Sequence, residues 1–409
     1  MTGSPALKTM NKVILAYSGG LYSSLILHWL KNKKGYEVVA FMAKLDLVER
    51  GSNLEEKAME LGASEVVVVD ILDDFVKDYV FPTLKSNAKY ESRYMFSTAL
   101  SRPLIIREML KEAFNLDCDS LAHGCSPSSN DSIRFETIVA SLSSDIEIIS
   151  PWPKWGISTF EDIKRYTKRY NLKLDALVEP DLIDENIWGR SIKPKRVVLD
   201  AWTEPPDEIF ALTTNPLKAP NEPNEIELEF KQGLPTHLNG KVLGGTDLID
   251  HLNKIGGKHG IGRIVGMENM LTGMKSRELY EAPAATILYT AHQALEELTL
   301  AKDLLSFKEI ASRHYAKLIY QGLWFGELRE SLDAFFNQTQ ISVSGKVRIR
   351  LYKGNCIVLG SDSPHSLFRR RISRGKYPQR AFLPAMEFTQ IPILLQEPLG
   401  AESSYTDEG

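Results

Sequence analysis

A short polar segment near the N-terminus combines residue types that bind anions. The apolar run at residues 13–16 suits a buried parallel strand, and it leads into Tyr-Ser-Gly-Gly-Leu-Tyr-Ser-Ser at residues 17–24. Glycines let a backbone approach a ligand closely, and the free N–H groups at the start of a helix attract phosphate. The segment therefore predicts a phosphate-binding loop. A tight turn that needs glycine only for its geometry is the plainer alternative.

A second segment, residues 123–136, is rich in Ser, Asn and Asp and follows a strand pattern. Asn130, Asp131 and Arg134 bring an amide, a carboxylate and a guanidinium close together in the chain. Such groups can hold the amine and the carboxylate of an amino acid through charge-assisted hydrogen bonds. The open alternative is an Asx-type turn that caps the following helix.

Strand and helix patterns alternate along the chain up to about residue 170. The expected strands are residues 13–16, 37–43, 65–71, 120–124 and 146–150, and the expected helices are residues 21–30, 54–61, 73–88 and 101–114. This alternation predicts a parallel sheet with helices on both faces, whose ligands bind beyond the carboxyl ends of the strands. Gly19, Gly20 and Gly124 would all lie at that edge.

The pattern changes after residue 172, where prolines interrupt the chain repeatedly. Residues 225–230 and 346–352 alternate like half-buried antiparallel strands, and residues 282–307 suit a helix. The expected fold class is α/β, with a parallel-sheet nucleotide-binding domain and a second α+β domain. The expected division is a flexible N-terminus at 1–11, the nucleotide-binding domain at 12–172, the second domain at 173–363 and a basic, irregular tail at 364–409.

The overall composition is that of an ordinary globular protein. The chain has 409 residues, 43% of them hydrophobic, and a net charge of -4, which gives no general attraction to nucleic acid or to anionic membranes. No apolar run is long enough for a membrane span, and the N-terminus lacks the apolar core of a signal peptide. Three scattered cysteines and eight histidines form no metal-binding spacing. We therefore expect a cytoplasmic protein with no resident metal.

Five further segments are weak motifs alone but informative in order. They are residues 90–103, residues 184–191, the glycine-rich residues 256–263, Glu268-Asn269 and residues 273–280. Together with the loop at 16–24 and the segment at 123–136, they resemble the argininosuccinate synthetase family of the ATP pyrophosphatase-loop group. The resemblance extends from about Lys12 to Ser363, and it includes non-catalytic stretches such as residues 220–223 and 351–355.

This resemblance implies an ATP-dependent, AMP-forming ligase with Mg²⁺ that joins citrulline to aspartate through a citrullyl-adenylate, in a homotetramer. It implies a nucleotide site formed by Ala16, Tyr17, Ser18, Gly19, Gly20, Leu21, Ser23, Ser24, Ala43 and Gly124. It implies a site for the two amino acids formed by Tyr94, Thr98, Ser126, Asn130, Asp131, Arg134, Ser191, Glu268 and Tyr280. Asp131 and Arg134 would be the catalytic residues.

Several positions depart from the family's pattern. Tyr22 stands where the family has Asp, and Ser126–Asp131 lacks a Lys and two glycines of the family's loop. Ala99 and Leu182 replace serines that contact citrulline. These changes leave three alternatives open: the same chemistry on a different ureido, amide or carboxyl substrate, a non-catalytic nucleotide-binding paralogue, or, motivated only by the basic tail, an enzyme acting on tRNA.

Overall fold

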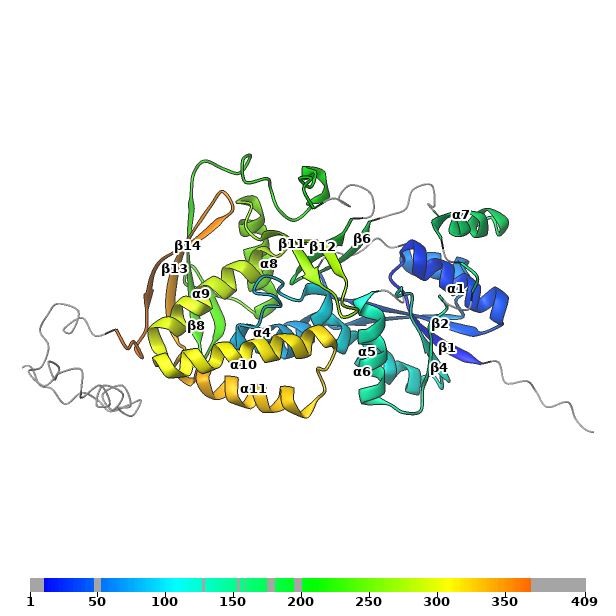
Figure 1. Ribbon diagram of the computed structural model, residues 1–409, viewed down its shortest axis with the longest axis horizontal. Coiled ribbons are helices and arrows are strands. Elements are labelled where there is room, and N and C mark those ends of the chain that lie inside the picture. The colour runs from blue at the N-terminus through cyan, green and yellow to red at the C-terminus, as the bar shows by residue number, and fades with distance from the viewer. Residues whose placement is uncertain are drawn as a thin grey trace, which may run out of the picture.

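The computed structural model describes residues 11–47, 53–126, 129–152, 155–157, 159–174, 181–194 and 201–368. The expected flexible N-terminus, apart from Asn11, and the expected basic tail beyond residue 368 lie outside the described residues. Figure 1 shows the N-terminal parallel sheet at one end, the sheet of β8, β13 and β14 at the other, and β11 and β12 between them. No helix in the described ranges is long and apolar enough to cross a membrane.

The N-terminal half is built on a five-stranded parallel sheet in the order β3-β2-β1-β4-β5. Its elements are β1 (Lys12–Ala16), α1 (Leu21–Lys34), β2 (Glu37–Lys44), α2 (Leu54–Glu60), β3 (Glu65–Asp70), α3 (Leu72–Phe75), the π-helical turn η1 (Val76–Val80), α4 (Phe81–Ser86), α5 (Ser97–Asn115), β4 (Ser120–Ala122), α6 (Asn130–Leu142), β5 (Glu147–Ile149) and α7 (Phe160–Arg169).

Alternating side chains of these strands enter two separate cores. Val13 and Leu15 of β1 pack with α1, α2 and α7 on one face of the sheet. Ile14 of the same strand packs with α5 and α6 on the other face. Helices cover both faces of the sheet. Polar side chains can therefore gather only at its edges, and ligands of this fold class bind at the carboxyl edge, where the strands end.

The C-terminal half contains two antiparallel sheets, in the orders β10-β9-β8-β13-β14 and β11-β12-β7-β6. Its elements are β6 (Leu182–Asn186), β7 (Gly189–Lys193), the 3₁₀ turn η2 (Asp207–Ile209), β8 (Asn224–Lys231), β9 (Leu234–Leu238), β10 (Lys241–Val242), α8 (Gly245–Lys258), β11 (Arg263–Asn269), β12 (Lys275–Glu281), α9 (Pro283–Thr299), α10 (Lys302–Gln321), α11 (Glu327–Thr339), the 3₁₀ turn η3 (Gln340–Ser342), β13 (Gly345–Tyr352) and β14 (Asn355–Asp362). The predicted α/β class with a second α+β domain is confirmed.

One predicted helix is continuous but contains a π-helical turn, and another was wrong in continuity. The expected helix at 73–88 is confirmed from Leu72 to Ser86, where α3, the π-helical turn η1 and α4 follow one another without a break. The expected helix at 282–307 is two helices, because Leu300 and Ala301 are extended and Leu300 turns into the core. Apolar residues continue across that break, so hydrophobic periodicity alone did not show it.

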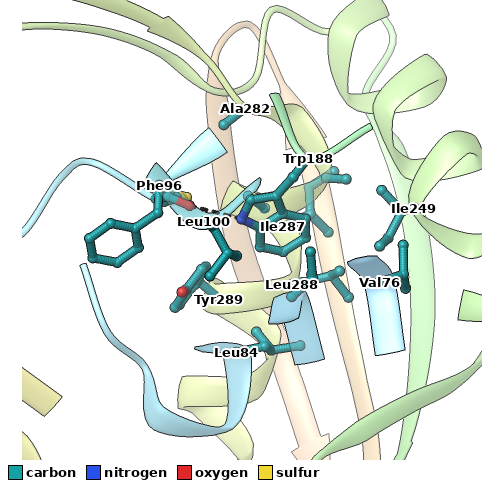
Figure 2. Close-up of a cluster of buried hydrophobic side chains, with 14 of the residues drawn as sticks. Val76, Leu84, Phe96, Leu100, Trp188, Ile249, Ala282, Ile287, Leu288 and Tyr289 are labelled. Carbon is teal, nitrogen blue, oxygen red and sulfur yellow. Dashed lines mark hydrogen bonds between the residues drawn. The ribbon is translucent and has the colours of Figure 1, made fainter. Parts of the chain in front are cut away.

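A large third core joins the two halves of the chain. Figure 2 shows Trp188, which follows β6, surrounded by Leu100 of α5, Ile249 of α8 and Leu288 of α9. The indole N–H of Trp188 donates a hydrogen bond of 2.8 Å to the carbonyl of Met95. This core therefore packs together segments that lie far apart in the sequence. Through Trp188 it also fixes the backbone at Met95, just before the polar residues that follow it.

Candidate active site

The turn between β1 and α1 has the geometry that its glycines predict. Gly19 has a φ of +73°, and a Cβ placed there would lie 2.3 Å from Leu54 Cδ2. Both the backbone conformation and the space therefore exclude larger residues. The hydroxyls of Ser18 and Ser23 lie 3.2 Å apart, and Ser23 also donates to the Gly20 carbonyl at 3.1 Å. The first N–H groups of α1 and these hydroxyls are donors that suit an anion, and residues 17–20 are here named the phosphate turn.

A pocket of about 630 Å³ opens beside this turn. Its lining comes from the turn and from the start of α2, and comprises Ser18, Gly19, Gly20, Asn53, Leu54, Glu56, Lys57 and Glu60. The pocket is large enough for a chain of phosphate groups. It lies on the β2 side of β1, because α2 connects β2 to β3.

The remaining predicted nucleotide residues surround the same turn, but not all of them face the pocket. Gly124 follows β4, and a Cβ there would lie 3.2 Å from Ile26 Cδ1 and 3.8 Å from the Ser23 nitrogen. Ala16 and Ala43 lie at the carboxyl ends of β1 and β2. The Tyr17 ring is buried in the core, Ser24 is fully buried, and Leu21 packs partly against that core.

Tyr22, where the resembled family has Asp, occupies the first turn of α1. Its ring lies against Trp152, with the two ring centroids 5.6 Å apart. The Trp152 indole N–H donates in turn to the Gly124 carbonyl at 3.1 Å. An aromatic pair therefore connects the phosphate turn to the end of β4 in this chain.

Asp131 lies between two arginines at the start of α6. Arg134 donates to one of its carboxylate oxygens at 2.7 Å, and Arg102 of α5 donates to the other at 2.8 Å. Burial alone would raise the pKa of Asp131, but the charges and hydrogen bonds of Arg102 and Arg134 bring it below its ordinary value. Asp131 is therefore a carboxylate at neutral pH, suited to fixing two guanidinium groups rather than to exchanging a proton. Arg102 also pairs with Asp184 of β6.

A carboxylate with two phenols forms the neighbouring part of the site. Glu268 of β11 accepts hydrogen bonds from the hydroxyls of Tyr280 and Tyr320. Asn130 donates to the Tyr320 oxygen at 2.7 Å and to Glu268 at 3.4 Å. Burial, together with the charge of Glu268, raises the pKa of both phenols, so both remain neutral donors.

The predicted residues of α5 and β7 adjoin this cluster. The rings of Tyr94 and Tyr280 stack with centroids 4.4 Å apart, and the Tyr94 oxygen accepts from the backbone nitrogen of Thr98 at 3.1 Å. The hydroxyls of Ser97 and Ser191 lie 2.7 Å apart. The buried Thr98 hydroxyl has no hydrogen-bond partner among the described residues. Ser126 begins the turn that leads to α6, and residues 127–128 of this predicted loop lie outside the described residues.

Sequence reasoning missed several residues that complete the site. Arg102 and Asp184 lie inside segments that were already selected for their resemblance to the family. Their charged side chains within those segments could have identified them as site residues. Tyr320 has no motif around it; its position at the end of a helix gave no sign that it would contact Glu268 and Asn130. Lys57, which donates to the Gly19 carbonyl at 2.6 Å, likewise lies in an ordinary helical pattern.

These features define a class of protein: an α/β domain with a phosphate turn at the carboxyl edge of a parallel sheet, joined to an α+β half that adds carboxylate and phenol groups to that edge. Residues 12–173 match the model described as the Arginosuccinate synthase N-terminal HUP domain, and residues 182–381 match the Arginosuccinate synthase C-terminal domain. The chain belongs to the argininosuccinate synthase family, as the resemblance predicted.

Individual relatives agree with this assignment. The chain is 45% identical over 376 residues to an argininosuccinate synthase of Desulfitobacterium hafniense, which covers 91% of this chain and 94% of the relative. It is 43% identical to those of Pelodictyon phaeoclathratiforme and Roseiflexus sp.. The two alignments cover 88% and 89% of this chain, and 90% of each relative. The similarity therefore spans both halves of the molecule.

Proposed function

We propose that this chain condenses citrulline with aspartate and cleaves ATP to AMP and pyrophosphate. The observation that carries the proposal is that β1 and β4, which are neighbours in the parallel sheet, lead at their carboxyl ends to the glycine turn and to the segment of Asp131, in a member of this family. The ureido oxygen of citrulline attacks the α-phosphorus, and pyrophosphate leaves with the electrons of the broken P–O bond. The aspartate amine then displaces AMP from the citrullyl-adenylate and loses a proton.

The residues of the site suit positioning and charge stabilisation rather than nucleophilic catalysis. The backbone N–H groups of the turn would hold the phosphates. Asn130 and Asp131 would orient aspartate, with Arg134 fixed by Asp131. Glu268 and Tyr280, with Ser191, would hold the amino-acid end of citrulline.

Mg²⁺ fits the same pocket. It needs only one or two carboxylates beside phosphate oxygens, and Glu56 and Glu60 line the pocket next to the turn. No group of three or more His, Cys, Asp or Glu side chains in the described residues is arranged to hold a metal by itself. When bound, Mg²⁺ would neutralise the charge of the departing pyrophosphate.

The resemblance further supports a homotetramer in the cytoplasm and the division of the chain at about residue 172. Light scattering of the purified protein measures the first of these. A tetramer is expected, and a monomer at micromolar concentration would contradict it.

The direct test of the reaction is product formation with each substrate omitted in turn. AMP and pyrophosphate should appear together, and only when ATP, Mg²⁺, citrulline and aspartate are all present. If ATP binds but no product forms, the chain is not a citrulline ligase.

One specific observation favours a second candidate, the same ligase chemistry on a less polar partner than citrulline. Ala99 is fully buried beside Tyr94, and Leu182 is 36% exposed on β6, so two hydroxyls of the family's citrulline pocket are replaced by apolar groups. Thermal-shift measurements with citrulline and with other ureido and amide compounds distinguish the two. Stabilisation by citrulline as large as that by aspartate would exclude the second candidate.

A further inference from the structure

Lys57 is a cation held directly against the phosphate turn. Its ammonium donates a hydrogen bond of 2.6 Å to the carbonyl of Gly19, the glycine whose left-handed conformation shapes the turn. The contact joins α2 to a residue 38 positions earlier in the chain. An ammonium has three donors, and this bond uses one of them.

The charge of Lys57 has no acidic partner in the described part of the chain. No carboxylate there lies within 4.0 Å of its nitrogen, whereas many other lysines of the chain form such pairs. Burial lowers the pKa of Lys57, and no neighbouring charge offsets that effect. A partly desolvated cation without a counter-charge favours an anionic ligand.

The pocket beside Lys57 suits such a ligand. Among the described residues that line it, Lys57 is the only cation, and it lies next to the backbone and hydroxyl donors of Ser18, Gly19 and Gly20. Glu56 and Glu60 line the same pocket and would repel a bare phosphate chain. The lysine therefore supplies the positive charge that the protein itself brings to this space.

The position of the pocket indicates which phosphates would occupy it. Asn130, which contacts Glu268 of the proposed citrulline site, lies beyond β4, on one side of β1, whereas α2 lies on the other side, next to β2. In phosphoryl and nucleotidyl transfer the attacking and leaving oxygens are roughly in line with the phosphorus. A nucleophile on the β4 side therefore directs the leaving group toward α2.

We propose that Lys57 binds the β- and γ-phosphates of ATP and holds the pyrophosphate as it leaves. This inference rests on the proposed function, because it assigns a role within the same reaction. Lys57 does not exchange a proton; its two remaining ammonium donors bind phosphate oxygens, while the third stays on Gly19.

Calorimetric titration of the full chain with ATP, inorganic pyrophosphate and AMP tests the proposal. Lys57→Gln should weaken ATP and pyrophosphate binding by about tenfold or more, the usual loss when a charge-assisted hydrogen bond is removed, and leave AMP binding unchanged. Lys57→Arg should retain most of the affinity. Lys77→Gln, which removes an exposed lysine from η1, is the matched control and should change none of the three.

A measurement on the unaltered protein does not depend on the variants folding. Pyrophosphate should protect Lys57 from acylation by an amine-specific reagent, as read by peptide mass spectrometry, and AMP should not. Equal losses of ATP and AMP binding in Lys57→Gln, or no protection by pyrophosphate, would overturn the inference while leaving the ligase intact. An unaltered protein that binds no ATP would overturn the proposed function itself.

Discussion

The contacts of Tyr320 show how one residue outside every motif can organise a site. Its hydroxyl donates to Glu268 and accepts from Asn130, its ring stacks on Tyr90 with centroids 3.6 Å apart, and its carbonyl accepts from Arg134 at 2.8 Å. The side chain is 1% exposed. Tyr320 is therefore a positioning residue that sets Asn130, Arg134 and Glu268 relative to one another.

Tyr320→Phe removes the hydroxyl and keeps the ring. We expect the KM for citrulline to rise by about tenfold, because Glu268 and Asn130 each lose a charge-assisted or neutral hydrogen bond, with the Kd for ATP unchanged. Steady-state kinetics and ATP titration measure the two quantities. Tyr315→Phe is the control, since its buried hydroxyl bonds Asp333 at 2.6 Å, outside the site. An equal rise of KM in both variants would show that Tyr320 contributes only to stability and does not position the site residues.

At the scale of elements, the turn between β1 and α1 depends on its packing against α2 as well as on its own glycines. Gly19 and Gly35, which ends α1, have nearly the same positive φ, +73° and +70°. Of these two glycines, Gly19 alone has a neighbouring atom within 4 Å of the position that a Cβ would occupy. Alanine substitutions at the two positions therefore distinguish the cost of a left-handed backbone, which both carry, from the cost of a steric conflict, which only Gly19 carries.

Gly19→Ala should weaken ATP binding by about tenfold or more, because the turn must move away from Leu54, and should cost more stability than Gly35→Ala. The latter should cost about 1 kcal/mol of unfolding free energy, from the left-handed backbone alone, and leave ATP binding intact. Titration and chemical denaturation measure both. Adding Leu54→Ala to Gly19→Ala should restore part of the affinity, and no restoration would show that the steric conflict is unimportant.

The sheet β11-β12-β7-β6 carries a carboxyl group with an unusual titration. Glu278 of β12 is 9% exposed, and burial raises its pKa to about 7, against the opposing effects of Ser276 and Lys193. A folded-state pKa above the unfolded value of about 4.3 means that the folded protein binds the extra proton. Stability is then lost as the pH rises from that value through 7.

Glu278→Gln removes this titration. The variant should be more stable than the unaltered protein at pH 8, by on the order of 3 kcal/mol, with the gain shrinking to near zero only below about pH 4. Urea denaturation at several pH values measures the difference. A gain that does not change with pH would show that Glu278 does not titrate in this range.

The elements themselves were largely predictable, and their contacts were not. Period-two and period-3.6 patterns located β1, β2, β8 and α1 because each has a single buried face or a continuous apolar run. Patterns could not show the break at Leu300, since both sides of it are apolar, nor the contact of Tyr320 with Glu268, which lie 52 residues apart. Such contacts depend on how helices pack, which local sequence does not specify.

At the scale of the whole molecule, the two halves share one hydrophobic core. That core includes residues from Ile71 to Leu104, which precede the predicted division at residue 172, together with α8, α9 and α10. The segment from Tyr90 to Ser101 lies on this core and carries Tyr94 and Ser97 into the site. The geometry of the site therefore depends on packing at a distance from it.

Trp188→Ala tests this dependence. Trp188 is fully buried, and its removal should lower the free energy of unfolding by about 3–5 kcal/mol. Because its indole also holds the Met95 carbonyl, we expect the KM for citrulline to rise while the Kd for pyrophosphate, whose proposed site is the turn between β1 and α1, stays unchanged. Trp202→Ala is the control, since that side chain is 93% exposed and its loss should change stability by no more than about 0.5 kcal/mol. If Trp188→Ala weakened pyrophosphate and citrulline binding equally, the two parts of the site would depend on the shared core to the same extent. If it changed neither, the segment after Met95 would keep its conformation without that core.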